Sequence, residues 1–280
     1  MTAREDQRQA HVAIFDSGVG GLTVARAIAN AMPGVRLRYL GDTARLPYGT
    51  KGQRTVARYA LQASNHLLGQ DDDDKFDALV VACNTASACA LEALRAHYDL
   101  PVLGVIEPGA ATAVECSKSG HIGVIGTERT VASKAYHQAI SNIAPSHSVH
   151  ALATPLLVSL AEEGWFDHPV TETVLETYLG PWFEREETGQ IDTLVLGCTH
   201  YPVFKPLLQR VLKRLTGRDL ALVDSAEATA RSLQKVLGPT SAHPQPGEVR
   251  LLATDASERF SRIAGLFFPL QAKHLELVDL

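Results

Sequence analysis

Short apolar runs alternate with stretches of helical spacing along almost the whole chain, and this alternation most limits the possible fold. The runs are apolar on both faces, which is typical of strands in parallel sheets that helices cover on both sides. They cover residues 11–16, 37–41, 78–83, 101–106, 121–126, 150–154, 193–198, 220–224 and 249–254. Helical spacing is clear in ASACALEALRAHY and in PVFKPLLQRVLKRL. The chain is therefore predicted to be an α/β protein with mainly parallel sheets.

The sequence also repeats itself at long range. HVAIFDSGVGGLTVARAI begins at residue 11 and HIGVIGTERTVASKAYHQAI at residue 121, an offset of 110. FDALVVACNTA begins at residue 76 and IDTLVLGCTHY at residue 191, an offset of 115. Two independent anchors with nearly equal offsets predict two similar α/β halves, in keeping with a length of 280 residues that exceeds one usual domain.

A cysteine follows the equivalent strand in each predicted half, Cys83 in the first and Cys198 in the second. Ligands of open α/β sheets bind at the carboxyl ends of the strands, so the two thiols are expected to face one cleft from opposite sides. Each thiol precedes a helix, whose positive end favours thiolate and whose N–H groups can bind an anion. Two opposed bases suit racemisation, because one removes a proton from one face of a carbon and the other returns a proton to the opposite face.

Other interpretations of these cysteines stay open. Free cysteine is among the most buried residue types, and Cys89 and Cys116 are interpreted as packing residues. A zinc site formed by Cys83, Cys89, Cys198 and His200 would lack the close C-x₂₋₄-C spacing. A hydrolase using Cys198 with His200 as its base is a further alternative.

The segment DSGVGG resembles a dinucleotide-binding loop only in part. The third glycine of G-x-G-x-x-G is missing, and Thr23 stands in its place. The segment is better explained as a tight strand-to-helix turn that exposes Asp16 and Ser17, with an N-cap as the alternative role of Asp16.

Charge and composition exclude several classes of partner. The net charge is −5 and no Lys/Arg cluster is present, which argues against nucleic-acid binding. No apolar run reaches the ~20 residues of a membrane helix, and MTAREDQRQAHV lacks the apolar core of a signal peptide, so a cytoplasmic protein without a membrane partner is expected.

Four cysteines in a reducing compartment are expected to be thiols. The acidic run 71–74 is interpreted as a solvated loop.

Several motifs together resemble one enzyme family. IFDSGVGGLTV, GDTARLPYGTK, VVACNTASACAL, PVLGVIEPGA, LVLGCTHYP and LVDSAEATA are similar to segments of the cofactor-independent glutamate racemases of bacterial cell-wall synthesis, over about residues 11–235. The resemblance implies two flavodoxin-like α/β/α domains around an active-site cleft. The first domain would comprise residues 1–107 plus 221–280, and the second residues 108–220. The implied activity is two-base interconversion of L- and D-glutamate, which supplies D-glutamate for peptidoglycan synthesis and so for cell shape.

The resemblance also implies residue roles. Cys83 would take the α-proton of D-glutamate with help from Asp16, and Cys198 that of L-glutamate with help from His200. Glu162 would lie near the second thiol, with Glu163 as the alternative. The implied substrate-binding residues are Asp16, Ser17, Tyr48, Gly49, Asn84, Thr85, Thr199 and His200.

No metal and no cofactor are expected. Pyridoxal phosphate, the usual electron sink for this chemistry, needs a Schiff-base lysine, and no lysine stands at a strand end beside these motifs. The resemblance implies a homodimer, and it leaves open whether a nucleotide-linked peptidoglycan precursor acts as activator. The rival hypotheses are a racemase of a related acid such as aspartate and a binding or regulatory module without turnover.

Overall fold

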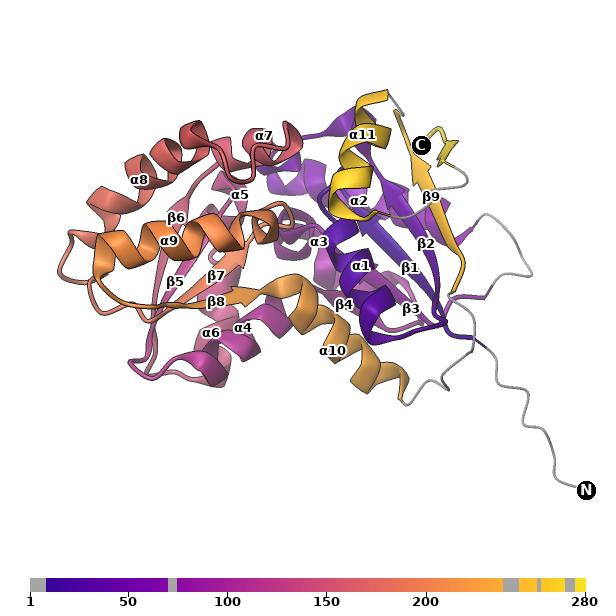
Figure 1. Ribbon diagram of the computed structural model, residues 1–280. Helices are drawn as coiled ribbons and strands as arrows, with labels where there is room; N and C mark the ends of the chain where they lie inside the picture. Colours follow the sequence, from indigo (N-terminus) through magenta and orange to yellow (C-terminus); the bar gives the residue numbers. More distant parts are fainter. Residues whose placement is uncertain (1–8, 70–74, 239–246, 256–257, 270–274) are drawn as a thin grey trace, which may run out of the picture.

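The computed structural model of the chain describes residues 9–69, 75–238, 247–255, 258–269 and 275–280. The acidic run 71–74, predicted to be a solvated loop, lies outside the described residues. Figure 1 shows two sheets side by side, each with helices on both of its faces.

Two parallel sheets form the framework of the protein. The first contains β1 (His11–Asp16), β2 (Arg36–Gly41), β3 (Ala78–Val81), β4 (Val102–Gly104), β9 (Val249–Ala253) and β10 (Leu275–Leu277), in the order β10-β9-β2-β1-β3-β4. The second contains β5 (His121–Gly126), β6 (Ser148–Ala153), β7 (Thr193–Gly197) and β8 (Ala221–Asp224), in the order β6-β5-β7-β8. All of these neighbouring strands pair in parallel. The predicted α/β fold class is confirmed.

The two sheets share one strand order, which is the structural counterpart of the sequence repeat. β2-β1-β3-β4 in the first sheet corresponds to β6-β5-β7-β8 in the second. In both, the chain starts in the middle of the sheet and reverses its direction of winding between the first and third strands. Side chains that follow these two strands therefore lie at a topological switch point, where α/β proteins bind ligands.

Helices connect the strands. The α-helices are α1 (Leu22–Ala31), α2 (Gln53–Leu68), α3 (Asn84–His97), α4 (Ile106–Cys116), α5 (Glu128–Ala132), α6 (Ala135–Ile143), α7 (Leu156–Glu162), α8 (Pro169–Phe183), α9 (Lys205–Thr216), α10 (Ser225–Leu237) and α11 (Glu258–Phe267). Short 3₁₀ turns are η1 (Thr43–Arg45), η2 (Tyr48–Thr50) and η3 (Tyr201–Phe204). α9 shows why such segments are helical: it buries Leu207, Leu208, Val211 and Leu212 on one stripe, and it ends at Gly217, whose φ of 68° suits glycine.

Alternate residues of each strand face different helix layers. In β1, Val12 and Ile14 pack with α1, whereas Ala13 and Phe15 pack with α2 and α3. In β7, Leu194 and Leu196 pack in the cluster that contains α8 and α9, and the intervening Val195 packs with α4 and α6. This period of two fixes the register of each sheet, because a slip of one residue would turn every side chain to the wrong layer.

The predicted domain boundary at residue 221 falls at the start of β8 and stays a prediction. It assigns β8 to the first domain, but β8 pairs with β7 in the second sheet. β8 joins the second sheet because its backbone forms hydrogen bonds with β7. The spacing of apolar residues does not show which sheet a strand joins. We propose that the first domain comprises residues 1–107 plus 225–280 and the second residues 108–224.

The last part of the chain returns to the first sheet. β9 pairs with β2, and α11 packs beside α1, so the C-terminal segment lies next to the first strands in Figure 1. Phe267 at the end of α11 is buried and contacts the ring of His200 edge-on at 5.6 Å between centroids. Among the residues that the structure describes, no helix combines the length and the apolar character needed to cross a bilayer.

Candidate active site

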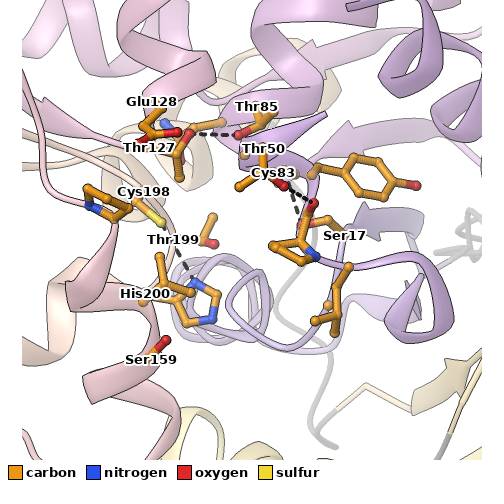
Figure 2. A pocket seen from close by; sticks show the side chains of 18 of the residues that line it. Ser17, Thr50, Cys83, Thr85, Thr127, Glu128, Ser159, Cys198, Thr199 and His200 are labelled. Atoms are coloured by element: carbon orange, nitrogen blue, oxygen red, sulfur yellow. Dashed lines mark hydrogen bonds between the residues drawn. The ribbon is translucent and has the colours of Figure 1, made fainter. Parts of the chain in front are cut away.

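Both strand-end cysteines line one cavity of about 180 Å³ between the two sheets. Cys83 follows β3 and Cys198 follows β7, and the two residues are 5% and 7% exposed. Figure 2 shows them on opposite sides of this cavity. The space is that of a small molecule, and its walls come from both halves of the chain.

Cys83 is held at the start of α3. Its sulfur accepts a hydrogen bond from the Ala86 N–H at 3.4 Å, and its S–H donates to Ser17 Oγ at 3.4 Å. Behind it lies Asp16, which is 1% exposed and accepts from Gly18 N–H at 3.0 Å and from Tyr39 Oη at 3.3 Å. Burial raises the pKa of the Asp16 carboxyl, although the charge of His200 and nearby backbone N–H groups oppose this effect.

Cys198 belongs to a chain of three polar side chains. Cys198 Sγ lies 3.7 Å from His200 Nδ1, and His200 Nε2 lies 3.2 Å from Glu162 Oε1 at the end of α7. Burial by itself lowers the pKa of His200, but the hydrogen bonds to Cys198 and Glu162 outweigh it and raise the pKa to about 10. His200 is therefore an imidazolium at neutral pH and can donate to the sulfur.

The other predicted site residues lie around the same cavity, apart from one. Its lining includes Ser17, Tyr48, Gly49, Asn84, Thr85, Glu162, Thr199 and His200. Asp16 is not in the cavity wall formed by the described residues, so its direct contact with a substrate stays a prediction. Glu162 faces the cavity, whereas the neighbouring Glu163 is exposed. The structure thus places Glu162, and not Glu163, beside the second thiol.

Asp42, a buried carboxylate that supports the wall of the cavity, is a site residue that was not predicted from the sequence. Asp42 follows β2, is fully buried, and accepts hydrogen bonds from the hydroxyl of Tyr48, from Arg45 Nε at 2.7 Å and from Thr254 Oγ1 at 3.0 Å. These bonds fix Tyr48 and join its loop to the end of β9. Asp42 could have been found by the rule used for the cysteines, since it also follows a strand and lies in GDTARLPYGTK.

A sequence model of one family, described as Asp/Glu/Hydantoin racemase, matches residues 22–233 of this chain. The chain belongs to that family. The predicted resemblance to glutamate racemases is confirmed by close relatives of that name.

Relatives of this racemase family align with nearly the whole chain. The glutamate racemase of Koribacter versatilis is 44% identical over 293 aligned residues, which cover 96% of this chain and 97% of the relative. The Francisella tularensis glutamate racemase in complex with D-glutamate has a TM-score of 0.83 and 31% identity, covering 97% of this chain and 98% of that one. The Escherichia coli glutamate racemase in complex with L-glutamate and the activator UDP-MurNAc-ala has a TM-score of 0.75 and 29% identity, covering 97% and 99%.

Ionisation of the first thiol in this racemase differs from the sequence-based expectation. The helix N-terminus predicts a thiolate at Cys83, but burial and the adjacent Asp16 carboxylate raise the pKa of its thiol to about 12. The hydrogen bonds with Ser17 and Ala86 lower the pKa only in part. Cys83 is therefore a thiol at neutral pH. Among the described residues, no group of three or more His, Cys, Asp and Glu side chains has the arrangement of a metal site.

The raised pKa of His200 predicts a pH-dependent stability. The folded state holds this proton up to about pH 10, whereas the ordinary pKa in the unfolded state is 6.5. The stabilisation is therefore fully present below pH 6.5 and is lost as the pH rises from 6.5 to about 10. Glu162→Gln removes one of the groups that raise this pKa, so the loss should end at a lower pH in the variant.

Urea unfolding at intervals between pH 6 and pH 10 measures this difference. The free energy of unfolding should fall more steeply with pH in the wild type than in Glu162→Gln at the alkaline end of the series. Glu163→Gln, on the exposed side of the same helix end, is the matched control and should follow the wild type. Parallel curves for wild type and Glu162→Gln would contradict the assigned pairing.

Proposed function

We infer that the protein interconverts L- and D-glutamate and thereby supplies D-glutamate for peptidoglycan synthesis. The observation that supports this most is the pair of thiols that line one small cavity from equivalent strand ends. Solved glutamate racemases of the same family, one of them in complex with D-glutamate, support glutamate as the substrate. The activator in the E. coli complex supports regulation by a nucleotide-linked peptidoglycan precursor as a further proposal.

We propose the following path from L- to D-glutamate. Cys198, as thiolate, takes the α-proton, so that an S–H bond forms and the electron pair of the C–H bond stays on the substrate carbon. The Cys83 thiol then gives its proton to the opposite face of that carbon and becomes a thiolate. The reverse reaction exchanges the two roles. Asp16 would assist Cys83, and His200, oriented by Glu162, would assist Cys198.

The site must stabilise the carbanion-like transition state strongly. If the α-proton is on the order of 20 pKa units less acidic than a thiol, its unaided transfer is about 27 kcal/mol uphill. A turnover of about 10 per second allows a barrier of only ~16 kcal/mol. Roughly 10 kcal/mol must therefore come from fixed hydrogen-bond donors around the substrate carboxylate. The N-terminus of α3 and the hydroxyls of Ser17, Thr85 and Thr199 line the cavity and can supply such donors.

Incubation of the wild-type protein with L-glutamate in D₂O, without added pyridoxal phosphate or metal, tests the proposed function. D-glutamate is expected to form with deuterium at Cα, because the Cys83 thiol that protonates the carbon carries a hydrogen isotope taken from the solvent. Aspartate is the parallel substrate in a second reaction. Exchange with aspartate but not with glutamate would instead indicate an aspartate racemase, and no exchange with either would indicate a binding module. A homodimer and a cytoplasmic location stay predictions.

A further inference from the structure

One short segment of the first half contacts the surroundings of both thiols. It comprises residues 16–23, which run from the last residue of β1 through the turn to the first two residues of α1. On one side, Ser17 Oγ lies 3.4 Å from Cys83 Sγ. On the other side, Thr23 Oγ1 lies 2.9 Å from the carbonyl oxygen of Thr199, which is 176 residues away and next to Cys198. The turn therefore connects the two halves of the cleft directly.

The packing at this connection leaves no spare room. A Cβ atom on Gly20 would lie 2.4 Å from Thr199 Oγ1 and 2.5 Å from the Cε1 and Nδ1 atoms of His200. The backbone of the turn is thus in close contact with the side chains that follow Cys198. Thr23 itself lies at the start of α1, where its hydroxyl is also 2.9 Å from the carbonyl oxygen of Gly20.

We propose that Thr23 is a positioning residue that sets the distance of Cys198 from Cys83. Thr23 lies outside the lining of the catalytic cavity among the described residues, so it acts through Thr199 and not on the substrate. Its hydroxyl proton is shared between the carbonyl oxygens of Gly20 and Thr199. This shared bond holds Thr199 against the turn, and with it the strand end that carries Cys198. The inference rests on the proposed racemisation, because it concerns proton transfer between the two thiols.

Loss of the hydrogen bond between Thr23 and Thr199 should change the products of the reaction in a way that a general loss of folding would not. Misplacement by about 1 Å can cost a catalytic step on the order of 100-fold. When Cys198 is displaced, the carbanion that Cys83 forms from D-glutamate survives longer before Cys198 protonates it from the opposite face. Cys83 then has time to exchange its proton with solvent and to return deuterium to the face from which it took hydrogen. Exchange without inversion should rise relative to racemisation.

Thr23→Val keeps the branched shape and removes the hydroxyl, and Thr23→Ser restores the hydroxyl. In D₂O with D-glutamate, Thr23→Val should lower kcat at least about tenfold with KM within twofold of the wild type. The ratio of deuterium in recovered D-glutamate to deuterium in L-glutamate should rise at least threefold. Thr23→Ser should regain most of both. Thr173→Val, which removes an exposed hydroxyl bonded to the Pro169 carbonyl at 3.0 Å in α8, is the matched control and should behave like the wild type.

Amide hydrogen exchange of the segment 198–204 adds a measurement that does not depend on turnover. Thr23→Val should speed exchange there, and Thr173→Val should not. This readout keeps the inference testable if the wild type fails to racemise glutamate, which by itself would overturn only the proposed function. Two results for Thr23→Val would each overturn the role of Thr23: a turnover within twofold of the wild type, or unchanged amide exchange. The role would also be overturned if Thr23→Ser lost as much turnover as Thr23→Val while the deuterium ratio stayed unchanged.

Discussion

Replacement of Cys83 or of Cys198 by serine is expected to abolish racemisation in both directions, with kcat/KM at least about a thousandfold below the wild type. A serine hydroxyl is a far weaker acid than a thiol and cannot exchange protons with the substrate carbon at a useful rate. Both directions must fail together, because enantiomers have equal free energies and the two values of kcat/KM are tied to an equilibrium constant of one.

Deuterium exchange should reveal which face each thiol serves. Cys83→Ser keeps Cys198 and should still exchange the α-proton of L-glutamate without inversion. Cys198→Ser keeps Cys83 and should exchange only the α-proton of D-glutamate. Mass and chiral analysis of glutamate recovered from D₂O measures both results.

Cys89→Ser is the control for these variants. Cys89 is a half-buried free thiol in α3 and lies outside the lining of the cavity in the described part of the chain. Its replacement should keep most of the activity. Near-normal turnover in either strand-end variant would contradict the two-base assignment, and exchange of the same enantiomer by both variants would contradict the assigned faces.

Gly20→Ala is expected to lower kcat/KM by about 100-fold, the second largest effect that the structure predicts. The new methyl group would overlap Thr199 Oγ1 and the ring of His200 at 2.4 and 2.5 Å. Both side chains are buried, and Phe267 and Glu162 contact the ring of His200 from other sides, so it cannot move away freely. The methyl group must therefore displace His200 from Cys198, or separate the two halves of the cleft.

Gly52→Ala is the matched control, since a Cβ atom at Gly52 would have no neighbour within 4 Å. It should leave kcat/KM within twofold of the wild type. Steady-state kinetics in both directions, with circular dichroism to confirm folding, compares the two variants. Activity of Gly20→Ala within threefold of the wild type would mean that the segments can separate without cost to catalysis.

Local sequence patterns were sufficient to predict most of the fold. The apolar runs and the repeat predicted parallel sheets and two similar halves, because burial on both faces leaves a continuous apolar run for each strand. β10, only three residues long, gave no such signal. The pairing of β8 with β7 gave no such signal either, since the apolar pattern of a strand is the same whichever sheet the strand joins.

The site was predictable where a residue follows a strand, as Cys83 and Cys198 do. The contact between Thr23 and Thr199 was not, because it joins positions 176 residues apart and is created by docking of the two halves. The pKa of the Cys83 thiol was predicted in the wrong direction, since a helix N-terminus can be read from sequence but the depth of burial and the neighbouring charge of Asp16 cannot.

The return of the C-terminal segment to the first sheet has a consequence for protein synthesis. Cys83 and Cys198 leave the ribosome before two residues that support the site. These are Thr254, which donates a hydrogen bond to Asp42, and Phe267, which contacts His200. The nascent chain can build its second sheet while the first still lacks β9 and β10 beside β2. The sheet whose strands are made first is therefore completed last.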